Sequence, residues 1–263
     1  MTKALIAFIF LVAFAGPAGA VGTLAEITIF DRAENRVLPV YQHEGRYYVA
    51  GRPGNEYTIN VRNRQSGDIL TVVSVDGVNA ISGETANWSQ TGYVLGSYMN
   101  YGIKGWRKNL QRTAAFFFTE LDNSYAARTG RANDVGVIGV AVFRRKAEPP
   151  AGISRHDEKR RAFDNEDRSA SEAQPAAKDE IAQGASRVMP APPASPKLGT
   201  GHGQSETSVV RYTNFERAST NPDEVIAIYY DSYRNLVAQG VIRDYPRYAR
   251  PSPFPGQFVP DPR

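Results

Sequence analysis

The 263-residue sequence contains no cysteine. Disulfide bonds, thiolate metal ligands and a cysteine nucleophile are therefore excluded within it. Histidine is scarce, with three residues, and no apolar run after the first 20 residues approaches the roughly 20 residues of a membrane-spanning helix. The remaining composition has 41% hydrophobic, 22% charged and 11% aromatic residues, which is typical of a globular protein with a packed core.

Residues 1–20 have the pattern of a secretory signal. Lys3 precedes an uncharged apolar stretch, which ends in the small residues Ala18-Gly19-Ala20. The alternative is a retained membrane span, but the apolar stretch is only about a dozen residues long, shorter than a spanning helix. We therefore expect cleavage after Ala20, a periplasmic or secreted protein, and no stable membrane span after the signal is removed.

Residues 21–146 carry the pattern of β-strands. Ten short runs rich in β-branched and aromatic residues are separated by Gly, Asn and Asp. Strict alternation from Tyr57 to Arg62 predicts that Tyr57 faces a core, and the pair Asp76-Gly77 predicts a two-residue hairpin turn. The uncharged run from Val135 to Phe143 predicts a central strand. The expected fold is mainly β, an antiparallel β-sandwich of jelly-roll type.

The composition changes twice after this domain. Few aromatic and many Pro, Ala and charged residues predict a disordered linker at 147–205. Residues 206–245 predict a small module that docks on the sandwich, with strands at Val209 to Phe215 and Val225 to Tyr230 and a helix capped by Asp231 or Ser232. One short helix or none is expected around Glu120 to Arg128, with Asp122 or Asn123 as its possible cap. Residues 246–263 are expected to form an extended Pro-rich tail.

Several segments resemble a group of exported proteobacterial proteins to which no activity is assigned. They include Ser74-Val75-Asp76-Gly77-Val78-Asn79, Gly92-Tyr93-Val94-Leu95, Gly105-Trp106-Arg107-Lys108, Ser124-Tyr125-Ala126-Ala127-Arg128 and Gly136-Val137-Ile138-Gly139-Val140, with Gly199-Thr200-Gly201-His202-Gly203 and Tyr229-Tyr230-Asp231-Ser232 near the C-terminus. The resemblance implies a location in the periplasm of a Gram-negative bacterium. It also implies the same organisation of the chain, in which the two parts that resemble this group are joined by a variable linker. It implies no catalytic residue, cofactor or substrate.

Catalytic patterns are weak. His43, His156 and His202 lie in three different segments, and none belongs to a spaced ligand set, so we expect no metal and no cofactor. A carboxylate pair for glycoside hydrolysis could be drawn from the acidic residues Asp76, Glu84, Glu120 and Asp122. The alternative is that Asp76 stabilises the β-turn that it forms with Gly77, and that the side chains of the other three residues are exposed to solvent.

Aromatic and basic residues give the candidate binding site. Five aromatic residues fall close together, namely Trp88, Tyr93, Tyr98, Tyr101 and Trp106. We expect Tyr93 and Trp106 in the core and the other rings to be ordinary half-buried residues. The alternative is an exposed aromatic platform for a ligand, for which Trp88 and Tyr101 are the best candidates. The basic residues that accompany them are Lys104, Arg107 and Lys108. The alternative is a solvated basic rim.

These patterns predict an exported cell-envelope binding or assembly protein without catalytic activity. Its expected partner is an envelope protein or an anionic glycan, and nucleic acid is disfavoured by the export signal. The alternative function is a glycan-acting hydrolase that uses paired carboxylates on the sandwich. The sequence does not indicate an oligomeric state.

Overall fold

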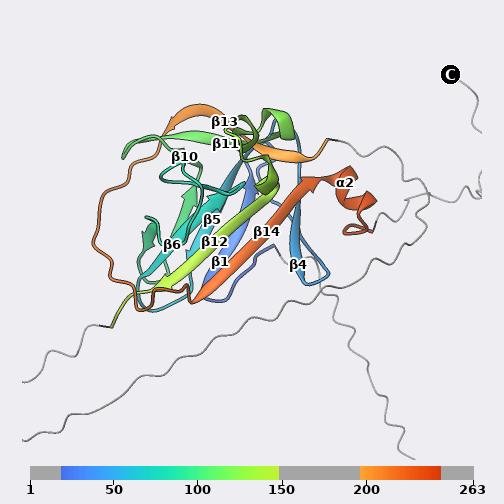
Figure 1. The fold of residues 1–263 in the computed structure, drawn as a ribbon. Helices are drawn as coiled ribbons and strands as arrows, with labels where there is room; N and C mark the ends of the chain where they lie inside the picture. Colours follow the sequence, from blue (N-terminus) through green and yellow to red (C-terminus); the bar gives the residue numbers. More distant parts are fainter. Residues whose placement is uncertain (1–18, 148–195, 244–263) are drawn as a thin grey trace, which may run out of the picture.

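The computed structural model describes residues 19–147 and 196–243. They form two β-sheets packed face to face, so the predicted β-sandwich is confirmed (Figure 1). The predicted signal at 1–20, except for its last two residues, the tail at 246–263 and positions 148–195 of the predicted linker lie outside the described residues. Within the described ranges, no helix has the length and hydrophobicity needed to cross a bilayer.

The first sheet is built mainly from the N-terminal half of the chain. Its strands are β1 (Ala25–Asp31), β2 (Arg36–Val37), β5 (Glu56–Asn63), β9 (Asn100–Ile103), β10 (Gly105–Arg107), β11 (Arg112–Glu120) and β13 (Leu198–Thr207). β5 pairs with β1 on one side and with β9 and β11 on the other, while β13 pairs with β11 along its length.

The second sheet places the most apolar strand near its centre. Its strands are β3 (Val40–His43), β4 (Arg46–Gly51), β6 (Ile69–Val75), β7 (Val78–Asn79), β8 (Tyr93–Leu95), β12 (Val137–Arg144) and β14 (Glu224–Ser232). β12 lies between β6 and β14, which confirms the central strand predicted from Val135 to Phe143. β14 pairs with β4 in parallel, so the expectation of a purely antiparallel sandwich is wrong at this pair.

The helical elements are short. They are η1 (Leu121–Asn123), α1 (Tyr125–Arg128), η2 (Ala132–Asp134) and α2 (Tyr233–Ala238). Ser124 caps α1 with its hydroxyl, not Asp122 or Asn123, because its Oγ accepts from the N–H of Ala127, three residues on. Ser232 caps α2 in the same way, as one of the two predicted caps.

The core between the sheets follows the predicted alternation. Tyr57, Ile59 and Val61 of β5 are fully buried, and Trp106 and Tyr93 are buried as expected. The Asp76-Gly77 turn is also confirmed, with φ of 53° and 72° at its two residues. One side of each strand therefore supplies the hydrophobic contact that holds the sheets together.

The C-terminal part of the chain is not a separate docked module. Leu198–Ser205, which we expected in the linker, belong to β13, and β14 is inserted between β12 and β4. Both sheets need these strands to bury their faces, so the sandwich extends to 196–243. The predicted strand from Val209 to Phe215 is wrong: it is irregular, because Val210 N–H is its only backbone group that bonds to another described backbone group.

Candidate functional site

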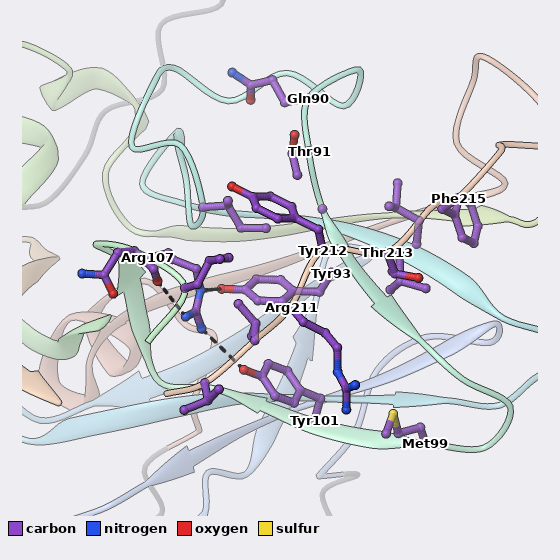
Figure 2. A pocket seen from close by; sticks show the side chains of 18 of the residues that line it. Gln90, Thr91, Tyr93, Met99, Tyr101, Arg107, Arg211, Tyr212, Thr213 and Phe215 are labelled. Atoms are coloured by element: carbon purple, nitrogen blue, oxygen red, sulfur yellow. Dashed lines mark hydrogen bonds between the residues drawn. The ribbon is translucent and has the colours of Figure 1, made fainter. Parts of the chain in front are cut away.

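A groove of about 1060 Å³ lies on one side of the sandwich. Three regions form its walls: residues 89–94 before and within β8, residues 99–110 around β9 and β10, and the connection from β13 to β14. We call residues 208–217 of this connection the strap. The strap runs along the side of the sandwich (Figure 1), and its side chains line the groove in Figure 2.

Arg107 fastens the first residue of the strap to the sandwich. Its Nη1 donates to the carbonyl oxygen of Ser208 at 2.7 Å and its Nη2 donates to the Ser208 hydroxyl at 2.9 Å. Longer contacts of 3.4 and 3.5 Å reach the hydroxyls of Tyr93 and Tyr101, and Nη1 also donates to Asn109. Arginine has five N–H donors, so this guanidinium is largely engaged by the protein itself.

Tyr93 and Tyr101 form the aromatic wall beside Arg107. Their ring centroids lie 5.5 Å apart, and the guanidinium carbon of Arg107 lies 5.8 Å from the centre of the Tyr93 ring. Burial raises the pKa of the Tyr93 hydroxyl, although Arg107 opposes the shift. The phenol is therefore neutral at ordinary pH and accepts a hydrogen bond from Arg107 Nε.

Arg217 fastens the other end of the strap. Its guanidinium donates to the carbonyl oxygens of Trp88 at 2.8 Å and Gln90 at 2.7 Å, and it lies 4.1 Å from the centre of the Phe143 ring. Burial lowers its pKa. Arg145 adds a hydrogen bond of 3.2 Å to the carbonyl oxygen of Asn214. The strap is thus held at both ends, and its middle residues are left between the two arginine contacts.

The middle of the strap is exposed. Tyr212 has 84% of its surface exposed and Val209 has 71%. The side chains of Arg211 on the strap and Lys108 opposite make no hydrogen bond or ion pair with any described residue. These two cations are therefore available to a ligand, unlike Arg107 and Arg217.

The groove has a strongly one-sided charge. Its lining contains four cations, and none of the described residues that line it is an Asp or a Glu. The four are Arg107, Lys108, Arg211 and Arg217. Tyrosines and aliphatic side chains make up most of the remaining wall. Such a surface attracts negative charge, and its attraction weakens as salt is added.

The structure brings three of the five predicted site residues together. Tyr101, Arg107 and Lys108 line the groove. Trp88 is half exposed and lines a separate shallow hollow on the outer face of the second sheet, with Val225. Lys104 is exposed and lines neither hollow.

Sequence reasoning missed the strap residues Arg211, Tyr212 and Arg217. The run from Val209 to Phe215 is rich in β-branched and aromatic residues like a strand, so nothing local marks it as a groove wall. It lies about one hundred positions after Arg107, and only the pairing of β13 with β11 brings the two regions together.

None of the acidic residues that were candidates for a catalytic pair lines the groove. Asp76 is completely buried and lines none of the three hollows described here. Glu84, Glu120 and Asp122 share no hydrogen bond within the described residues, and none of them lines the groove. The described part of the chain also has no group of three His, Asp or Glu side chains arranged to hold a metal ion.

Asp76 is instead the centre of a buried hydrogen-bond network. Its Oδ1 accepts from the Tyr230 hydroxyl at 2.6 Å and from Gly136 N–H at 2.8 Å, and its Oδ2 accepts from Thr200 N–H at 2.8 Å. The Thr200 hydroxyl also contacts the hydroxyls of Tyr230 and Tyr57, at 2.6 and 2.7 Å. Burial raises the pKa of Asp76, against the opposing effect of these hydrogen bonds. The network crosses the core, and none of its residues lines the groove or the two smaller hollows.

The two described histidines lie away from the groove. His202 is exposed and stacks beside Trp106, with ring centroids 6.3 Å apart, at a small hollow that Tyr125 and Arg128 also line. His43 lies 3.8 Å from the exposed carboxylate of Glu44. His156 lies outside the described residues.

No family model, curated protein or solved structure matches this chain. The resemblance to exported proteobacterial proteins therefore stays a prediction. The assignment of the groove as a candidate binding site depends on its geometry and its side-chain chemistry alone.

Proposed function

We propose that the protein is exported to the bacterial envelope and binds an anionic ligand in the groove without catalysing a reaction. One observation supports the proposal above all: the described residues that line the groove include four cations and no carboxylate. Two of these cations, Lys108 and Arg211, have no partner among the described residues. A ligand with negative charges would supply the partners they lack.

The residues that line the groove are better suited to binding a ligand than to hydrolysing one. A glycoside hydrolase needs two carboxyl groups on either side of the bond that breaks, and the described groove wall has neither. Tyr101 and Tyr212 instead offer ring surface and hydroxyl groups, which suit recognition. The apolar stretch and small-residue site within 1–20 support export.

The test is a binding titration on protein purified from a periplasmic extract, where an N-terminus at Val21 is expected. Two anionic probes, oligogalacturonate and a short peptide that alternates Glu with Val, are compared with a neutral maltooligosaccharide and a Gln–Val peptide. At least one anionic probe should bind about tenfold or more tightly than its neutral counterpart, and less tightly as salt rises.

Two charge-reversed variants complete the test. The double variant Lys108→Glu, Arg211→Glu should lose this binding. The matched variant Lys104→Glu, Arg128→Glu also reverses one lysine and one arginine, but neither residue lines the groove, so it should bind like the unaltered protein. Equal affinity for charged and neutral probes, or cleavage of a glycan probe, would contradict the proposed function.

A further inference from the structure

We infer that the occupant of the groove is an extended acidic segment of a partner protein, which lies along the strap and pairs with its backbone. The inference rests on the proposed function, because it names the chemistry of the anionic ligand. Three features of the groove lead to it: unpaired backbone in the strap, an apolar wall and the placement of the free charges.

The backbone of the strap is open to pairing. Val210 N–H donates to the carbonyl oxygen of Leu110, but the N–H groups of Val209 and of residues 211–213 donate to no described residue. The carbonyl oxygens of residues 209–213 accept from none either. A peptide main chain matches such a row with its own donors and acceptors, as when a bound segment adds a strand to a sheet. A glycan has no comparable regular row of amides.

The wall of the groove is more suited to side chains than to sugars. Met99, Leu110 and Val209 are exposed aliphatic residues in this wall, and Tyr212 is the most exposed large hydrophobic residue among those described. Tyrosine, methionine and arginine are enriched where proteins meet, whereas aliphatic groups offer a sugar no hydrogen bond. The wall therefore favours a segment that has apolar residues between its charges.

The free charges specify acidic residues in that segment. Arg107 and Arg217 are engaged in holding the strap, so charge recognition falls to Lys108 and Arg211. Arg211 and Tyr212 extend to opposite sides of the strap in Figure 2. A segment that alternates acidic and apolar residues would meet both kinds of group, since successive side chains of an extended chain point to opposite sides.

Fluorescence anisotropy with labelled probes tests the inference. The Glu–Val peptide should bind about tenfold or more tightly than both its Gln–Val counterpart and oligogalacturonate of equal charge. A Glu–Val peptide N-methylated at alternate residues cannot donate those backbone hydrogen bonds, so its affinity should also fall about tenfold or more. When the unmodified peptide is bound, hydrogen exchange of the amides in 209–213 should slow.

The outcomes separate the inference from the proposed function. If oligogalacturonate binds as tightly as the peptide, or the N-methylated peptide binds unchanged, the peptide assignment is wrong while anionic binding stands. If neither anionic probe binds, both fail. Tyr212→Ala changes a ring that is 84% exposed, so its fold should be intact by circular dichroism. This variant should bind the Glu–Val peptide more weakly than the unaltered protein does. Unchanged affinity would overturn the predicted contact between the peptide and the strap.

Discussion

Asp76 joins parts of the chain that are far apart in sequence. Its carboxylate accepts hydrogen bonds from residues 60, 124 and 154 positions away, in Gly136, Thr200 and Tyr230. Asp76 lies in the turn with its side chain completely buried, where its carboxylate accepts from the N–H groups of Gly136 and Thr200 and from the Tyr230 hydroxyl. An unsatisfied buried donor costs about 1–3 kcal/mol, so the network stabilises the contact between the two halves of the chain.

The buried tyrosines of this network predict unfolding at alkaline pH. Burial raises the pKa of Tyr57 and of Tyr230 well above the ordinary value near 10. Above that pH the unfolded chain loses these two protons while the folded protein keeps them, so the free energy of unfolding falls as pH rises. The two groups together contribute a slope of about 2.7 kcal/mol per pH unit. Urea unfolding measured in steps above pH 10 gives the total slope, to which Tyr93 also contributes because burial raises its pKa.

The variant Tyr57→Phe removes one of the two buried hydroxyl groups, so it measures the contribution of that group to the pH dependence of stability. The variant should be less stable at neutral pH, since Thr200 loses a hydrogen-bond partner, but its slope above pH 10 should be shallower by about 1.4 kcal/mol per pH unit. Tyr212→Phe makes the same chemical change in an exposed ring and serves as the control. A slope unchanged by Tyr57→Phe would contradict the argument.

At the scale of elements, β13 is a strand whose glycines are required by its neighbours. A Cβ at Gly201 would lie 2.2 Å from the ring of Phe117 on β11, and a Cβ at Gly199 would lie 2.5 Å from Cβ of Ser124. Only glycine allows β13 to lie this close to β11 and to the cap of α1. The same glycines lower intrinsic strand propensity. The linker was predicted here because residues 147–205 are rich in Pro, Ala and charged residues and poor in aromatic residues.

Gly201→Ala should therefore destabilise the protein by about 1–3 kcal/mol, because the Phe117 ring must move to accommodate the methyl group. Thermal unfolding followed by circular dichroism measures the change. Gly67→Ala is the matched control, since nothing lies within 4 Å of the added carbon and its φ is not positive. Equal stability of the two variants would show that β13 can shift away from β11 without cost.

Across the whole molecule, local patterns predicted what depends on neighbours in sequence. Alternation placed Tyr57 in the core, and the chemistry of Asp and Gly located the turn at Asp76. Long-range pairing could not be predicted in this way. The carboxylate of Asp76 meets donors that no spacing indicates, and the strand-like run from Val209 to Phe215 is irregular.

The candidate site was predicted only in part for the same reason. Tyr101, Arg107 and Lys108 are near each other in sequence, so they were identified together. Arg211 and Tyr212 reach the groove through the strap, whose position depends on β13 and β14 belonging to different sheets. A sequence that gives no signal for β13 cannot locate the wall that follows it.

The shared sheets predict that the chain stays assembled after a cut between its two described parts. β14 pairs with β12 through six residues and with β4 through five, and its Ile226, Ile228 and Tyr230 are buried in the common core. A protease site engineered into 148–195 would separate residues 196–263 covalently without breaking these contacts. The two fragments should co-elute on size exclusion and separate only in denaturant.

Cleavage should nevertheless lower the stability in a characteristic way. The intact connection keeps the two parts at a high effective concentration, which is lost when it is cut. The melting temperature of the cut protein should therefore fall and should rise again with protein concentration, whereas the uncut protein should show no such dependence. Fragments that separate under native conditions would mean that residues 21–147 form a sandwich without β13 and β14. The strap would then be an addition to a complete domain, not a wall that the fold itself requires.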